Sequence, residues 1–150
     1  MEIKRYTKDR INDCLLFERE LRKEEDFWGW EIDDAYIASV FSSFEDPRFQ
    51  NSVSLLAYDG DRVVGRIDST MIYSHFDGST KAYLDWICVL KSCRHKAVAQ
   101  SLMTQLRKIL KEEYGANTLM GIIAANPEAQ RFYRALPNAL IRDEGIWIDL

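Results

Sequence analysis

One stretch of the sequence, residues 83–110, restricts the fold more than any other part of the chain: YLDWICVLKSCRHKAVAQSLMTQLRKIL. Its first seven residues are mostly apolar, as in a buried strand, and an amphipathic helix begins near residue 97. The basic segment 91–96 joins the two without proline or glycine. Because the first N–H groups of a helix have no partner inside the helix, such a turn can hold an anion. The stretch therefore predicts the phosphate end of a nucleotide-like cofactor site.

The size and composition of the chain predict one globular domain. A chain of 150 residues is long enough for one hydrophobic core, and its hydrophobic fraction of 47% and charged fraction of 29% are ordinary. No apolar run approaches the roughly 18 residues that a membrane span needs. The first residues, MEIKRYTKD, lack the apolar core of a secretory signal. We therefore expect a cytoplasmic protein that does not insert into a membrane.

Charge is distributed unevenly along the chain. The net charge of −4 argues against general nucleic-acid binding, which needs a basic face. Residues 18–34 contain eight acids and three bases, whereas residues 91–96 contain three bases and no acid. This polarity would suit an enzyme with an anionic cofactor and a cationic substrate. Solvated surface is the alternative and, for charge runs alone, the better supported one.

The cysteines and histidines do not form a metal-binding pattern. The three cysteines, Cys14, Cys88 and Cys93, include no CxxC pair, and we expect them to be free buried thiols. The two histidines, His75 and His95, are well separated in the sequence, so we expect no metal site.

Hydrophobic periodicity predicts a mixed α+β fold. Helices are expected over residues 9–23, 33–46, 97–114 and 127–136. Strands are expected over residues 2–6, 53–58, 62–73, 81–89 and 118–124, with two more in a final hairpin over 139–150 that turns at Asp143-Glu144-Gly145. Short connections make the second to fourth strands antiparallel, and the long connection through the third helix allows the fifth strand to return parallel to the fourth. We therefore expect a single domain with a seven-stranded sheet and four helices.

Several side chains predict where the helices begin and end. Thr7 or Asp9 can cap the first helix, and Asn126 followed by Pro127 can start the last one. Gly115 is expected to end the helix that begins near residue 97.

Two segments match the motifs of a known enzyme family. Arg94-His95-Lys96-Ala97-Val98-Ala99 follows a strand that ends in Ile87-Cys88-Val89, and Asn126, Ala129 and Tyr133 share the last helix. The first segment is similar to the acyl-CoA motif Q/R-x-x-G-x-G/A, and the second to the N-x-x-A…Y helix, of the GNAT N-acetyltransferase superfamily. The order of elements resembles that family over the whole chain. The resemblance implies a mostly antiparallel sheet with splayed strands at the cofactor cleft.

The first motif departs from the family at two glycines. Ala97 stands at the central glycine, and His95 stands at the glycine that usually follows the arginine. Glycine allows the backbone to approach the pyrophosphate closely. Ala97 is expected to fit with a negative φ, as in the first turn of a helix. The side chain of His95 must point away from the cofactor or contact a phosphate.

The resemblance implies that the chain uses acetyl-CoA, and the cysteine and histidine pattern predicts no metal. Backbone N–H groups of residues 95–99 would hold the pyrophosphate, and the charge of Lys91, Arg94 and Lys96 would add attraction. The backbone of residues 87–89 would pair with the pantetheine arm. Asn126 would lie near the same arm, and a helix cap is the alternative role of its side chain.

Tyr133 is the candidate acid. In the family, the tyrosine at this place donates a proton to the departing CoA thiolate, and a phenol with a pKa of about 10 is protonated at neutral pH. Phe132 and Tyr133 could instead be core aromatics beside Ala129. The motif favours catalysis for Tyr133 and the core for Phe132.

Asp85 is the candidate base that takes a proton from the amine, directly or through water. It lies in an otherwise apolar strand, and counting by two places it on the same face as Ile87 and Val89. A salt bridge or a contact at the sheet edge is an equally supported interpretation. Asp68 and His75 are weaker candidates.

The resemblance places the acceptor against the first two helices and their connection. That region combines aromatic rings with acids, which suit a cationic amine. These residues are Phe27, Trp28, Trp30, Glu24, Glu25, Asp26, Glu31 and Asp34. Core packing or a homodimer contact is the alternative for the tryptophans.

Together these features predict an N-acetyltransferase that moves the acetyl group of acetyl-CoA to a primary amine by direct attack in a ternary complex. A small cationic or polyamine-like acceptor is favoured, followed by a protein N-terminus or lysine, and an aminoglycoside would also need an acidic cleft. Neither Cys88 nor Cys93 has the histidine–acid pair that an acyl-carrying thiol needs. The alternatives are a non-catalytic acyl-CoA-binding module and an interaction domain that keeps only the fold.

Overall fold

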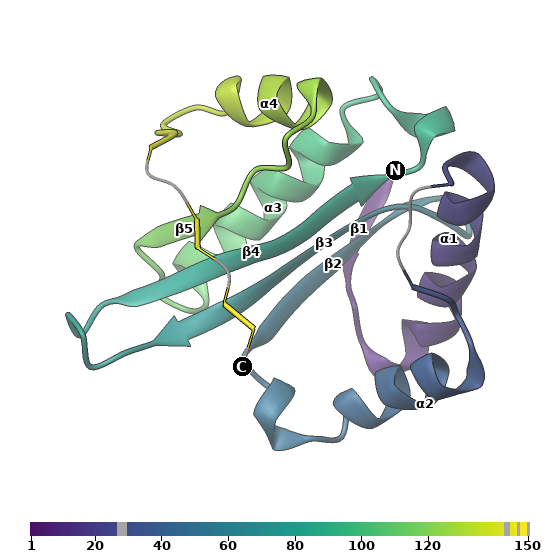
Figure 1. The fold of residues 1–150 in the computed structure, drawn as a ribbon, viewed down its shortest axis with the longest axis horizontal. Coiled ribbons are helices and arrows are strands. Elements are labelled where there is room, and N and C mark those ends of the chain that lie inside the picture. Colours follow the sequence, from purple (N-terminus) through teal and green to yellow (C-terminus); the bar gives the residue numbers. More distant parts are fainter. Residues whose placement is uncertain (27–29, 143–144, 147, 150) are drawn as a thin grey trace. The chain divides into compact units, whose positions relative to one another are not determined.

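A five-stranded sheet organises the computed structural model, which describes residues 1–26, 30–142, 145–146 and 148–149 (Figure 1). The strands follow the order of the sequence across the sheet. They are β1 (Glu2–Arg5), β2 (Ser52–Asp59), β3 (Arg62–Tyr73), β4 (Thr80–Val89) and β5 (Thr118–Gly121). β1 to β4 pair antiparallel, which confirms the predicted meander. The chain divides into two units, Met1–Met120 and Gly121–Leu150, and each is described by itself.

Four α-helices are present in the described residues, as predicted. They are α1 (Ile11–Glu24), α2 (Asp34–Ser43), α3 (Val98–Glu112) and α4 (Pro127–Arg134). Short 3-10 turns lie at η1 (Lys8–Arg10), η2 (Pro47–Phe49) and η3 (Lys91–Cys93). None of the helices among these residues is both long and apolar enough to cross a membrane.

α1 and α3 cover opposite faces of the sheet (Figure 1). Successive side chains of a strand point to opposite faces, and β3 shows this at Gly65 and Arg66. Gly65 faces Val98 and Leu102 of α3, whereas Arg66 pairs with Glu18 of α1. Alternation along one strand therefore separates an apolar face from a face that carries buried charge.

The apolar stripe predicted for the third helix is confirmed. Its members are all buried in α3, where they pack against the sheet: Val98, Leu102, Leu106, Ile109 and Leu110. A fully buried leucine contributes about 1.5–3 kcal/mol relative to an exposed one. This stripe therefore fixes the helix, and with it the turn that precedes the helix.

The structure confirms that the second helix starts near Asp33, and it contradicts the cap predicted for the first helix. Asp33 caps α2 by accepting a hydrogen bond from the Tyr36 N–H at 2.8 Å. The cap predicted for α1 at Thr7 or Asp9 is wrong, because the turn η1 precedes that helix and no side chain bonds to its first N–H groups. Beyond α3, Gly115 adopts a φ of 66°, as expected of a residue that ends a helix.

The predicted final hairpin is wrong, and the sheet has five strands rather than seven. No described residue between 139 and 149 belongs to a strand, and the predicted turn residues Asp143 and Glu144 lie outside the described residues. Leu140, Ile146 and Ile148 are exposed. Alternating apolar residues form a strand only where a neighbouring strand supplies hydrogen bonds. The sequence pattern cannot show whether such a neighbour is present.

Candidate active site

The turn between β4 and α3 contains two residues in the left-handed region. His95 has a φ of 63° and Ala97, the residue before the helix, has a φ of 59°. The prediction that Ala97 has a negative φ is therefore wrong. Both positions are those where the family pattern has glycine, so the backbone keeps the glycine conformation without the glycines. His95, Lys96 and Ala97 are all exposed.

The start of α3 supplies backbone donors for an anion. The first hydrogen bond within the helix runs from the Ser101 N–H to the Ala97 carbonyl at 3.0 Å. The N–H groups of Val98, Ala99 and Gln100 precede that bond and are available to an outside acceptor by the geometry of a helix. An anionic group fits this arrangement.

Gly65 of β3 lets the start of α3 approach the sheet, and it was not among the residues predicted from the sequence. A Cβ atom at this position would lie 2.8 Å from Val98 Cγ1 and 3.1 Å from Leu102 Cδ1. Only glycine leaves enough room for such contacts. The signal in the sequence was a glycine inside a predicted strand, between Val64 and Arg66.

Glu24, the last residue of α1, and Glu25, its C-cap residue, hold the turn before α3. Glu24 accepts hydrogen bonds from the Ser92 hydroxyl at 2.6 Å and from the Ser92 N–H at 3.2 Å. Glu25 Oε2 lies 2.5 Å from Arg94 Nη2. Both glutamates were predicted to meet the acceptor, whereas in the structure they contact the turn before α3. Arg94 is therefore engaged by a carboxylate, and Lys91 remains an exposed base of the same segment.

Ile87 and Val89, near the end of β4, lie on the face of the sheet that α3 covers. Ile87 pairs with Ile67, and Val89 pairs with Gly65, the glycine that contacts α3. Cys88 between them is buried, and burial raises the pKa of its thiol to about 12. Such a thiol is protonated at neutral pH, which agrees with the prediction that Cys88 carries no acyl group.

Asp85 occupies a β-bulge in β4. Asp68 pairs with Trp86, and the next residue of β3, Ser69, pairs with Leu84. Asp85 is therefore one extra residue opposite the β3 strand. Bulges redirect side chains and occur often beside active sites.

The bulge directs Asp85 toward the face of the sheet that carries Thr70. The Thr70 hydroxyl donates a hydrogen bond to Asp85 Oδ2 at 2.7 Å. Ile87 pairs with Ile67 on the opposite face. The prediction that Asp85 shares a face with Ile87 and Val89 is wrong, because the extra residue resets the alternation that counting by two assumes.

The surroundings of Asp85 favour its neutral form. Burial raises the pKa of Asp85, the hydrogen bond from Thr70 lowers it, and the negative charge of Asp68 raises it, with a net rise. The carboxyl group is still exposed enough to meet a substrate. A carboxylate whose pKa is raised holds a transferred proton more tightly, which is what a general base requires.

Asp68 and His75, the weaker candidates for the base, occupy other environments. Asp68 Oδ2 lies 2.7 Å from Arg66 Nε, so its charge is paired. His75 is exposed in the turn beyond the last pair of β3 and β4, Tyr73 with Thr80. Asp85 remains the stronger candidate.

A buried ionic cluster lies on the same face of the sheet as Asp85. Arg66 Nη1 lies 2.7 Å from Glu18 Oε1, and the Tyr36 hydroxyl donates to Glu18 Oε2 at 2.8 Å. The side chain of Glu18 is only 2% exposed, so the interpretation of this acid as solvated surface is wrong. With Asp68 as its second partner, Arg66 faces two carboxylates, which leaves one negative charge in excess.

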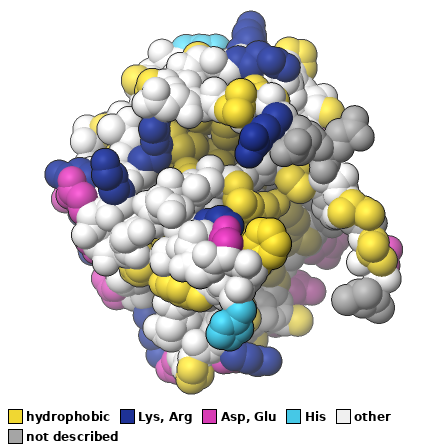
Figure 2. All heavy atoms as spheres, turned by 90° about the vertical axis from the view of Figure 1, so that its left-hand side faces the viewer, with side chains coloured by type: hydrophobic (Ala, Val, Ile, Leu, Met, Phe, Trp, Pro, Cys, Tyr) yellow, Lys and Arg dark blue, Asp and Glu magenta, His cyan; other side chains and the backbone are white. Residues whose placement is uncertain are grey.

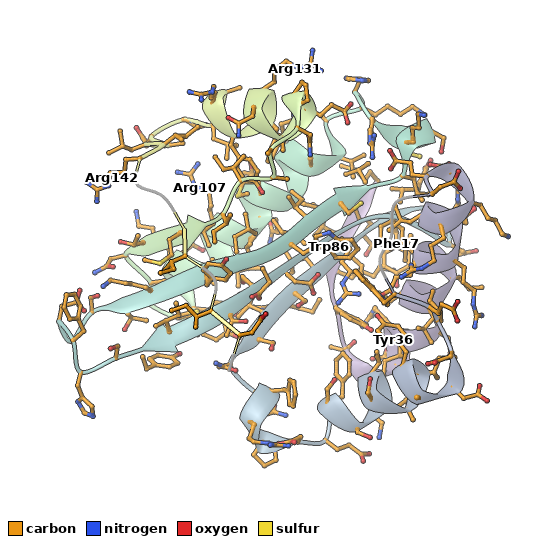
Figure 3. All side chains as sticks on the ribbon, viewed as in Figure 1. Phe17, Tyr36, Trp86, Arg107, Arg131 and Arg142 are labelled. Atoms are coloured by element: carbon orange, nitrogen blue, oxygen red, sulfur yellow. The ribbon has the colours of Figure 1, made fainter. Side chains whose placement is uncertain are left out.

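Aromatic rings lie against this cluster. Trp86 of β4 points to the α1 side of the sheet, toward Phe17 and Tyr36 (Figure 3). Its ring lies 5.5 Å from the Arg66 guanidinium carbon and 6.4 Å from the Trp30 ring. Trp30 in turn lies 6.5 Å from Tyr36. Aromatic faces beside an excess of negative charge suit a cation.

The other residues predicted to meet the acceptor are less informative. Asp26, Glu31 and Asp34 are exposed. Phe27 and Trp28 lie outside the described residues.

The second unit carries the other predicted site residues on α4. Asn126 caps this helix by accepting a hydrogen bond from the Ala129 N–H at 2.8 Å, which confirms the alternative role of its side chain. Tyr133 is partly buried beside Phe132, with ring centroids 5.1 Å apart, and burial raises the pKa of its phenol. Tyr133 is therefore protonated at neutral pH, as a proton donor must be.

The histidines do not come together in the fold. They are the cyan side chains at opposite ends of the face that Figure 2 shows. No group of three or more histidine, cysteine or acidic residues that could hold a metal occurs within the described parts of the chain.

A family model and several solved structures match the chain. The sequence model of the acetyltransferase (GNAT) family matches residues 3–136, whereas no curated protein matches the chain. Among solved structures, an aminoglycoside acetyltransferase, meta-AAC0020, from an uncultured soil metagenomic sample superposes with a TM-score of 0.82 at 16% identity, over 99% of this chain and 95% of the other.

Two further solved structures resemble the chain. AAC(6')-Iy in complex with a CoA-containing bisubstrate analogue superposes with a TM-score of 0.77 at 19% identity, over 99% of this chain and 97% of the other. The ribosomal-protein-alanine N-acetyltransferase from Brucella melitensis biovar Abortus 2308 superposes with a TM-score of 0.75 at 16% identity, over 100% and 99%. At these identities the likeness shows a shared fold.

Proposed function

The chain belongs to the acetyltransferase (GNAT) family, and on that premise we propose that it transfers the acetyl group of acetyl-CoA to a primary amine of a small cationic molecule, by direct attack in a ternary complex. The observation that carries the proposal is the bulge in β4. It directs Asp85 to the face with excess negative charge and aromatic rings, a few residues before the turn that suits a pyrophosphate.

Acetyl-CoA supplies the acetyl group as a thioester. In our proposal the N–H groups of residues 95–99 bind its pyrophosphate, with the partial positive charge of the α3 N-terminus behind them. The backbone of Ile87 and Val89 binds the pantetheine arm as a further strand would. The side-chain oxygen of Asn126 is used as the cap of α4.

Asp85 acts as the base in this proposal. An amine arrives as an ammonium ion and must lose a proton before its lone pair can attack the thioester carbon. Asp85 Oδ2 is occupied by Thr70, so the other carboxylate oxygen takes the proton, directly or through water. The raised pKa of Asp85 favours this transfer.

Tyr133 acts as the acid in this proposal. Its motif position in α4 and its protonated phenol support the role. Donation of the phenol proton to the sulfur would neutralise the thiolate as it leaves, and the second proton that the attacking nitrogen sheds would return to the phenol through water.

The acceptor is proposed to be cationic because its side of the sheet offers rings and carboxylates together. Trp30 and Trp86 already contact cations of the chain, with the Arg22 and Arg66 guanidinium carbons 5.0 and 5.5 Å from their ring centroids. The Glu18–Arg66–Asp68 cluster beside them leaves one negative charge in excess. The related structures include enzymes named for aminoglycosides and one named for a ribosomal-protein alanine. A protein N-terminus is therefore the second candidate acceptor.

A screen of amines tests the proposal. Purified protein is mixed with acetyl-CoA and a panel of diamines, polyamines, aminoglycosides and peptides with free N-termini, and the release of CoA thiol is measured. We expect release with small molecules that carry two or more amines. Release with peptides alone would favour the second acceptor, and tight CoA binding without release for any amine would favour a non-catalytic acyl-CoA-binding module.

A further inference from the structure

The contact between α1 and the cofactor turn is better shielded from water than an ordinary surface ion pair. The side chain of Glu25 is 12% exposed and that of Arg94 is 23% exposed. Exposed ion pairs contribute little because water and salt screen them. A shielded pair with an N–O distance of 2.5 Å is a strong, charge-assisted hydrogen bond.

The adjacent glutamate holds the same turn in a second way. Glu24 accepts hydrogen bonds from both the hydroxyl and the N–H of Ser92, so one carboxylate fixes the backbone and the side chain together. The hydrogen bond from the Ser92 hydroxyl is the main reason that the pKa of Glu24 lies below its ordinary value. Glu24 is therefore ionised at neutral pH and holds the turn as a carboxylate.

The turn needs such support because its backbone is strained. His95 and Ala97 both have positive φ without being glycine. Conformations of this kind persist only where the surrounding structure holds them. Contacts of Ser92 and Arg94 with α1 lie directly before the strained residues.

From these contacts we propose that Glu24 and Glu25 are positioning residues for the cofactor turn, and that Arg94 acts through Glu25 as a support for the turn instead of binding a cofactor phosphate. The proposal rests on the proposed function, since it takes residues 95–99 to be the cofactor turn. It assigns a role to two acids outside the R-x-x-A-x-A segment.

Replacement of Glu25 separates the two roles of Arg94 by the sign of its effect. If Arg94 binds a phosphate, Glu25 competes for it, and removal of the carboxylate should strengthen CoA binding. Loss of a negative charge near an anionic ligand acts in the same direction. If Arg94 supports the turn through Glu25, removal of the carboxylate should weaken CoA binding even though an unfavourable charge has gone.

The experiment measures the dissociation constant of CoA by calorimetry for Glu25→Gln, Arg94→Gln and the double variant. We expect each single variant to bind CoA roughly tenfold more weakly, as loss of a charge-assisted hydrogen bond predicts, and the double variant to be no weaker than either. Glu20→Gln is the matched control, because it removes an exposed α1 ion pair, with Arg62, by the same change. It should leave CoA binding unchanged.

Hydrogen exchange without CoA provides a second measurement that does not depend on binding. Peptides that cover residues 94–100 should exchange faster in Glu25→Gln than in the wild type and in Glu20→Gln. Tighter or unchanged CoA binding by Glu25→Gln, or unchanged exchange, would overturn the proposal. If the wild type binds no CoA, the proposed function fails, and the exchange result still decides whether Glu25 holds the turn.

Discussion

Glycine at residues 95 and 97 is expected to stabilise the protein. An L-residue in the left-handed region costs roughly 1–2 kcal/mol relative to glycine, and glycine loses about 0.5–1 kcal/mol through the greater entropy of the unfolded chain. With φ of 63° at His95 and 59° at Ala97, each change should yield a net gain of roughly 0.5–1 kcal/mol. The double variant should gain roughly 1–2 kcal/mol, which raises Tm by about 4 °C in a domain of this size.

Thermal and urea unfolding, followed by circular dichroism, measure this gain for His95→Gly, Ala97→Gly and the double variant. Ala99→Gly is the matched control, since it makes the same change two residues later, inside α3. There the entropic cost is not offset, and stability should fall by about 0.5–1 kcal/mol. If Ala97→Gly lowered Tm as Ala99→Gly does, the inference that the turn stores backbone strain would be refuted.

Four further changes test the site and its support. Asp85→Asn removes the base but keeps an acceptor for the Thr70 hydroxyl, and kcat/KM with a good amine should fall on the order of 10²–10⁴-fold. The acid limb of the pH–rate profile should disappear in this variant. In the wild type the raised pKa of Asp85 places that limb above the ordinary range of an aspartate. A carboxyl group whose pKa is raised by folding stabilises the protein at low pH, and this stabilisation is lost as pH rises through that pKa. Asp85→Asn should therefore not lower Tm at pH 7, and a lower Tm there would argue for a structural role of Asp85. Tyr133→Phe should lower kcat while CoA binding persists, and unchanged thiol release in single-turnover measurements would remove Tyr133 as the acid. Arg66→Met leaves Glu18 and Asp68 buried without a counter-charge and should cost about 3–5 kcal/mol in urea unfolding, whereas Arg62→Met at an exposed pair should cost less than about 1 kcal/mol. Gly65→Ala introduces a methyl group 2.8 Å from Val98 Cγ1 and should lower the free energy of unfolding by about 1–3 kcal/mol. A variant as stable as the wild type would contradict the close approach of α3 to Gly65.

Local patterns in the sequence were enough to predict most elements of the fold. The stripe from Val98 to Leu110 has helical spacing, and each of its positions is buried. Asn126 before Pro127 predicted the start of α4, and the structure has the cap at that residue. Such features depend on neighbours within a few residues, so the sequence contains them directly.

Tertiary structure decided which face each strand residue occupies. The sequence of β4 carries no mark of an extra residue, because a bulge is defined by the register with β3. Counting by two therefore failed at Asp85. In the same way, the alternation of the C-terminal segment did not produce a strand in the described residues, since a strand needs a neighbour.

The sequence by itself determined the family and the order of the elements from β1 to α4, because these follow from local patterns and motifs. Only the tertiary structure decided the partners of the charged residues. Glu18 and Arg66 are 48 residues apart, and Glu25 and Arg94 are 69 apart. Charges so far apart in the chain meet only when the fold brings α1 to β3 and to the turn before α3. A local sequence pattern covers only a few residues, so it cannot predict these pairs.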